Sequence, residues 1–203
     1  MLYLKKFFLF VIIFSLVTIP AFYIFKYSHS LAGIFYQTLK SDNNAITEFK
    51  KAIESNPDDA FAYYRLGLIY KDTKDFDKAE EIYLRLLRLF PNHPDANYDL
   101  GYVYREKGLL DKAMAQYKKA LVINPDNPYA HYDMGYIYRI NGQDDEALKE
   151  YKKVLDIDSR HAYAHYDIGL IYEKQGMIDD AKKEFHIAYK LKSKAERLQG
   201  QKK

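Results

Sequence analysis

The stretch YYRLGLIY at residues 63–70 decides the fold, because close variants of it return at a fixed interval. The variants are NYDLGYVY at 97–104, HYDMGYIY at 131–138 and HYDIGLIY at 165–172, each 34 residues after the one before. Four positions keep this interval through five units. They are Gly33, Gly67, Gly101, Gly135 and Gly169; Tyr36, Tyr70, Tyr104, Tyr138 and Tyr172; Ala45, Ala79, Ala113, Ala147 and Ala181; and Phe49, Tyr83, Tyr117, Tyr151 and Phe185. A period of this length indicates an array of structural repeats.

Each unit carries two amphipathic segments separated by a short polar turn. In the second unit, residues 59–72 and 77–90 place apolar residues at every third or fourth position, which is the period of an α-helix. Asp75, Asp111 and Asp144 stand near the start of the second segment of their units, and we predict that they cap its helix. The pattern therefore predicts an all-α chain built from helix-turn-helix units.

Proline and glycine indicate where these helices end and where they touch. Pro94 and Pro128 fit the first turn of a helix, where the missing N–H costs nothing. Pro91 and Pro125 are expected to end the helices before them. A Gly inside a helix costs about 1 kcal/mol relative to Ala, so the recurrent Gly predicts a close approach of the two helices of a unit. The recurrent small Ala fits the same contact, and neighbouring units are expected to stabilise one another by stacking.

In these positions the chain resembles the tetratricopeptide repeat (TPR) family, whose signature places Leu-Gly, Tyr, Ala, an aromatic residue and Pro within one repeat. The resemblance implies an α-solenoid with repeats at 26–59, 60–93, 94–127, 128–161 and 162–195, and a basic C-terminal tail at 196–203. The first unit departs most from the pattern, with Ala32 where the others carry Leu, Met or Ile. The last two units have Ser159 and Ser193 in place of Pro.

Residues 7–25, FFLFVIIFSLVTIPAFYIF, form an apolar run of 19 positions without a charge. At about 1.5 Å per residue, a helix of this length crosses a bilayer core. We therefore predict that residues 1–25 form a transmembrane signal anchor and that residues 7–25 contact the membrane. The alternative is a cleaved signal peptide with its cleavage site at Ser30-Leu31-Ala32, although such peptides have a shorter apolar region of about 7–15 residues.

The charge distribution favours one orientation of this predicted single-pass segment. The chain has 31 basic and 28 acidic residues, a net charge of +3 that stems largely from the flank of the apolar run, where Lys5 and Lys6 lie. Positive charge resists translocation, so the N-terminus is expected in the cytoplasm and the repeats outside it, in the periplasm of a Gram-negative bacterium. So small a charge does not indicate a nucleic-acid partner. The absence of Cys excludes disulfides and thiolate sites.

Catalytic and cofactor motifs are missing from the sequence, which has no Walker A, dinucleotide-binding, H-E-x-x-H or G-x-S-x-G pattern. We predict that the protein is not an enzyme and has no cofactor. His161 and His165 are four residues apart and could share a helical face as metal ligands. His131 and His165, however, occupy the large packing position of the family, and a third ligand is not evident, so no metal site is predicted.

The resemblance implies a protein-binding groove lined by the first helix of each repeat. Its positions are Phe61, Tyr64, Arg65, Leu68, Asp95, Tyr98, Asp99, Tyr102, Tyr129, Tyr132, Asp133, Tyr136, Tyr163, Tyr166, Asp167 and Leu170. Tyr offers a large apolar face and a hydroxyl at low entropic cost, which suits recognition. Asp99, Asp133 and Asp167 form an acidic row, so a basic or amphipathic segment of a protein partner is expected. The same row would repel a terminal carboxylate.

These features predict a membrane-anchored scaffold that binds protein partners and recruits or assembles complexes at the membrane. Two alternatives remain open. The protein could be structural and self-assemble through its C-terminal repeat. It could instead be an assembly factor or helper subunit for an enzyme or a photosynthetic complex.

Overall fold

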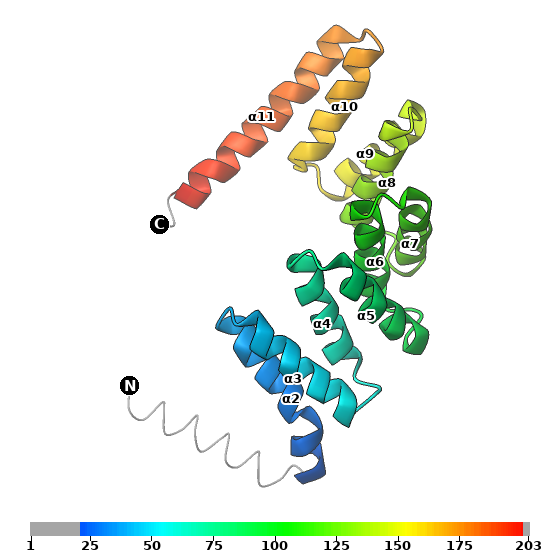
Figure 1. Ribbon diagram of the computed structural model, residues 1–203. Coiled ribbons are helices and arrows are strands. Elements are labelled where there is room, and N and C mark those ends of the chain that lie inside the picture. The colour runs from blue at the N-terminus through cyan, green and yellow to red at the C-terminus, as the bar shows by residue number, and fades with distance from the viewer. Residues whose placement is uncertain (1–20, 201–203) are drawn as a thin grey trace. The chain divides into compact units, whose positions relative to one another are not determined.

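The computed structural model describes residues 21–200, and that part of the chain contains ten α-helices and no β-strand (Figure 1). The helices are α2 (Ala21–Thr38), α3 (Asp42–Ser55), α4 (Ala60–Asp72), α5 (Phe76–Leu89), α6 (Pro94–Glu106), α7 (Leu110–Ile123), α8 (Pro128–Ile140), α9 (Asp144–Ile157), α10 (Ala162–Lys174) and α11 (Ile178–Gly200). Each predicted repeat contains two of them, so the predicted all-α helix-turn-helix architecture is confirmed.

The chain divides into two compact units, Met1–Pro91 and Asn92–Lys203. In the first unit α2 packs against α3, α3 against α4, and α4 against α5. In the second unit each helix from α6 to α10 packs against the next one along the chain. Helices that are adjacent in sequence are therefore also neighbours in space within each unit, as the stacking of repeats requires.

The two helices of a repeat meet at the recurrent glycine. A Cβ added to Gly67 would lie 2.5 Å from a ring carbon of Tyr83, and one added to Gly101 would lie 2.6 Å from Tyr117. The other three repeats show the same contact, between Gly33 and Phe49, Gly135 and Tyr151, and Gly169 and Phe185. These distances leave no room for a methyl group, and the predicted close approach is confirmed.

Helix starts agree with the prediction at the prolines and differ at two acids. Pro94 and Pro128 are the first residues of α6 and α8, and Asp75 caps α5 by accepting from the Lys78 backbone N–H. The predicted caps Asp111 and Asp144 are wrong, because both lie inside the first turn of their helices. The repeat fixes the cap 34 residues after Asp75, where Leu109 stands. Acids in the first turn still interact favourably with the helix dipole.

The predicted membrane segment, residues 7–25, falls mostly outside the described residues. Only residues 21–25 are described, and they form the start of α2. Within residues 21–200, no helix has both the length and the apolar character needed to cross a membrane. At the other end, α11 runs on to Gly200, so the last helix includes most of the predicted tail.

Candidate functional site

Tyrosine rings from successive repeats lie against one another in the second unit. The Tyr98 and Tyr129 ring centroids are 6.2 Å apart, and those of Tyr132 and Tyr163 are 6.5 Å apart. Tyr129 and Tyr132 are three residues apart on α8, where i,i+3 side chains are neighbours. Tyr129, Tyr163 and Tyr166 are 62%, 68% and 50% exposed. We call these five residues the tyrosine face, and they place predicted groove residues of α6, α8 and α10 together.

The acidic row expected beside these rings is buried. Asp99, Asp133 and Asp167 are only 3%, 4% and 5% exposed, so the expectation that they present negative charge to a partner is wrong. One residue along a helix is a rotation of about 100°. The acids therefore point away from the exposed tyrosine that precedes them and into the stack of repeats.

Asp133 and Asp167 instead join successive repeats. Asp133 of α8 accepts hydrogen bonds from the Tyr98 hydroxyl at 3.2 Å and the Arg105 guanidinium at 2.6 Å, both on α6. Asp167 of α10 accepts from the Tyr132 hydroxyl of α8 at 2.8 Å. Arg139 of α8 also lies beside it, with 3.5 Å between Nε and Oδ1. Charge and hydrogen bonding are thus satisfied within the protein beneath the tyrosine face.

The two arginines also stack on the remaining groove tyrosines. The Arg105 guanidinium carbon is 4.8 Å from the ring centroid of Tyr102 and 5.8 Å from that of Tyr136. Arg139 lies 5.4 Å from the same Tyr136 ring. Arg105 and Arg139 were missed by the sequence analysis, although they stand 34 residues apart. These cation–π contacts hold the half-buried rings in place.

Burial changes the acid–base properties of this network. It raises the pKa values of Asp133 and Asp167, and nearby Arg105 and Tyr132 only partly oppose that effect. The pKa values of the Tyr98 and Tyr132 hydroxyls are raised by burial and by the carboxylates they face. The phenols therefore remain neutral hydrogen-bond donors. His161, whose ring centroid is 5.0 Å from that of Tyr132, has its pKa lowered by burial.

The predicted groove residues of the first unit are arranged differently. Phe61 is 45% exposed, and its ring centroid lies 6.4 Å from that of Phe49. Arg65 stands at the position equivalent to the buried acids and donates to the side-chain oxygen of Gln37 on α2. The remaining predicted groove residues differ in exposure: Tyr64, Leu68 and Leu170 are half-buried, and Asp95 is exposed.

The large packing position of the repeat holds histidines that bind glutamates. His131 Nδ1 lies 2.6 Å from Glu150 Oε2, and its Nε2 lies 2.9 Å from the Pro125 carbonyl oxygen. His165 makes the same contact with Glu184 at 2.6 Å. His161 instead caps α10 by accepting from the Ala164 backbone N–H. No cluster of three or more His, Cys, Asp or Glu suited to a metal ion occurs among the described residues.

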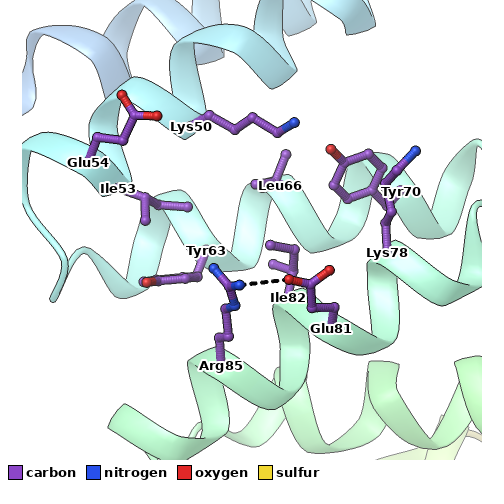
Figure 2. Close-up of a pocket in the computed structure, with 10 residues that line it drawn as sticks. All are labelled: Lys50, Ile53, Glu54, Tyr63, Leu66, Tyr70, Lys78, Glu81, Ile82 and Arg85. Atoms are coloured by element: carbon purple, nitrogen blue, oxygen red, sulfur yellow. Dashed lines mark ion pairs between the residues drawn. The ribbon is translucent and has the colours of Figure 1, made fainter.

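In the second repeat, Tyr63 and Ile82 take the positions of this His–Glu pair. Here a cleft of about 340 Å³ lies between α3, α4 and α5 (Figure 2). Ile53, Leu66 and Ile82 line it, and Arg85 at its edge pairs with Glu81 at 2.8 Å. Its charged rim is thus partly neutralised, and the tyrosine face is the stronger candidate for binding.

Comparison with family models identifies the repeat along most of the chain. Models described as TPR repeat match residues 39–74, 101–139 and 135–176. Models described as tetratricopeptide repeat match residues 60–93, 82–115 and 162–194. Comparison with curated proteins gives no match.

Solved structures share the fold. A crystal structure of MamA is 27% identical, covers 81% of this chain and 96% of its own, and has a TM-score of 0.75. MamA from Desulfovibrio magneticus RS-1 is 19% identical, with 83% and 96% coverage and a TM-score of 0.76. YrrB, described as a TPR protein with an unusual peptide-binding site, is 24% identical, with 78% and 82% coverage and a TM-score of 0.67. At these identities, the last two show similarity of fold alone.

Proposed function

Because the chain belongs to the tetratricopeptide repeat family, we propose that it is a membrane-anchored scaffold that binds a protein partner through the tyrosine face. The observation that carries this proposal is the exposure of Tyr129, Tyr163 and Tyr166, at 62%, 68% and 50%, above a buried polar network. Exposed aromatic residues on a rigid frame are typical of binding hot spots. The fixed frame also lowers the entropic cost of binding.

The structure narrows the chemistry of the partner. Since the acidic row is buried and neutralised, a basic segment has no exposed row of carboxylates to meet. The ring spacings of 6.2 Å and 6.5 Å match the roughly 6.6 Å between alternate residues of an extended chain. We therefore propose that the partner is an amphipathic segment in extended conformation, with apolar side chains at alternate positions facing the tyrosines.

Anchoring is proposed through residues 7–25, on the strength of their sequence alone. In this arrangement the N-terminus is cytoplasmic and the repeats lie outside the cytoplasm, where they would recruit components at the membrane surface. Removing residues 1–25 should release the protein from carbonate-washed membranes. Retention of the shortened chain in those membranes would contradict the anchor and leave the tyrosine face untouched.

The binding role is tested by capture from crosslinked membranes, with mass spectrometry of the bound proteins. We compare the full chain with the variant Tyr129→Ala/Tyr163→Ala. The control is Val122→Ala, which changes a side chain that is 83% exposed and outside the tyrosine face. The tyrosine variant should lose a partner that both the wild type and the control retain. An identical set of captured proteins in all three samples would refute the proposal.

A further inference from the structure

The first repeat exposes an apolar surface that later repeats bury. Phe35 of α2 is 58% exposed, and its neighbour Leu31, one helical turn earlier, is 64% exposed. The positions equivalent to Phe35 are at most 3% exposed: Ile69, Val103, Ile137 and Ile171. We call Leu31 and Phe35 the leading face.

Inside the second unit, the preceding repeat covers this position. Ile171 of α10 belongs to a core cluster with Tyr151 and Val154 of α9. Tyr132 and Leu155 pack against the edge of the same cluster. A defined set of side chains at the C-terminal side of one repeat therefore covers the leading face of the next.

The last repeat carries the same set in exposed form. The residues 34 positions after Tyr151, Val154 and Leu155 are Phe185, Ala188 and Tyr189, which we call the trailing face. Tyr189 is 74% exposed and Phe185 is half-buried, whereas the equivalent Tyr151 is 0% exposed. Within residues 21–200, the trailing face of this chain is thus left open.

We propose that the trailing face of one copy packs against the leading face of a second copy, repeating the contact between α9 and α10. Size favours this pairing, because Ala188 is smaller than the equivalent Val154 while Phe35 is larger than the equivalent Ile171. Such compensating changes keep the volume of a packed contact. The chain therefore contains both halves of one repeat-to-repeat interface.

Charge favours the same occupant. In the internal contact, Asp133 pairs with Arg105 of the preceding repeat. The residue equivalent to Arg105 in the last repeat is Glu173, and an Asp opposite it would be repelled. The leading face has Leu31 at that position instead of an acid. The junction between copies thus avoids a clash between two like charges.

Head-to-tail packing predicts a distinctive behaviour of two variants. Phe35→Glu removes the leading face and Tyr189→Glu removes the trailing face. Each should raise the dissociation constant for self-association by roughly tenfold or more, because an unpartnered charge is costly to bury. In a mixture, however, one intact leading face meets one intact trailing face. The mixture should form complexes of two copies and no larger ones.

Sedimentation velocity of the full chain in non-ionic detergent, over a range of concentrations, measures these states. Val122→Glu is the control, since it places the same charge at an exposed site outside both faces. A wild type that stays monomeric would overturn the proposal. If Phe35→Glu then also loses stability to urea, the chain's own residues before α2 cover the leading face. A mixture of variants that remains monomeric while the wild type associates would equally overturn the head-to-tail mode.

Discussion

The buried pair of His131 and Glu150 can be exchanged for pairs that the chain itself provides. At the equivalent positions the second repeat has Tyr63 and Ile82, and the third has Asn97 and Gln116. Polar, amide and apolar partners thus change together, since each side chain needs a matching neighbour when it is buried. We predict that His131→Tyr/Glu150→Ile preserves stability while either single change reduces it.

The magnitude follows from the contacts of Glu150. The residue is 7% exposed and is held by His131 at 2.6 Å and by Lys153 at 3.0 Å. His131→Tyr leaves the carboxylate with Lys153 alone, and removing one member of a buried pair costs about 3–5 kcal/mol. Replacing both members with apolar residues is often neutral or stabilising. The double variant also loses the hydrogen bond to Pro125, which contributes about 1 kcal/mol.

Urea unfolding of the full chain, followed by circular dichroism, gives the free energy of unfolding for each variant. A double-mutant cycle should show a coupling of about 2 kcal/mol or more between the two sites, within the range for residues in contact. The amide exchange His131→Asn/Glu150→Gln is the matched control with the hydrogen-bonding geometry of the third repeat. A double variant as unstable as the worse single variant would refute the reasoning, as would a His131→Tyr variant with wild-type stability.

Three further predictions concern the second unit. The pKa values of Asp133 and Asp167 are raised in the folded state, so the native protein binds more protons than the unfolded chain between about pH 4 and those raised values. Their contribution to the free energy of unfolding should fall as pH rises through that window. It is measured as the difference in urea stability between the wild type and Asp133→Asn/Asp167→Asn, and a difference that does not change with pH would contradict it. Arg105→Gln should cost about 2 kcal/mol or more in the same assay by leaving Asp133 without its cation, and an unchanged midpoint would show that the pair is unimportant. Gly101→Ala should cost about 1–3 kcal/mol because its Cβ overlaps the Tyr117 ring, and Tyr117→Leu in the same chain should recover part of the loss; no recovery would place the strain elsewhere.

The helices and their closest contacts could be predicted because the repeat imposes them. Gly67 and Tyr83 are typical of positions that steric contact fixes, and their interval alone revealed the close approach of α4 and α5. Caps were less predictable, since several acids cluster near each helix start. Only the register of Asp75 identifies which of those positions is the cap.

The polar network was missed because its partners lie in different repeats. Tyr98 and Asp133 are 35 residues apart, and Arg105 and Asp133 are 28 apart. Neither interval stands out in a period of 34, although Tyr132 and Arg139 keep the same intervals to Asp167. The resemblance placed these acids in a groove, and only the helix rotation between adjacent residues shows that they are buried.

The two kinds of buried polar contact have different consequences for recognition. The His131–Glu150 pair joins the two helices of one repeat, α8 and α9, and keeps that repeat intact. The bonds from Tyr98 and Tyr132 to the next repeat orient rings that belong to the tyrosine face. Because their hydroxyls are already bonded within the protein, these two rings offer a partner mainly their apolar faces. Binding through them therefore depends on shape and apolar contact, which favours an amphipathic segment over a strongly charged one.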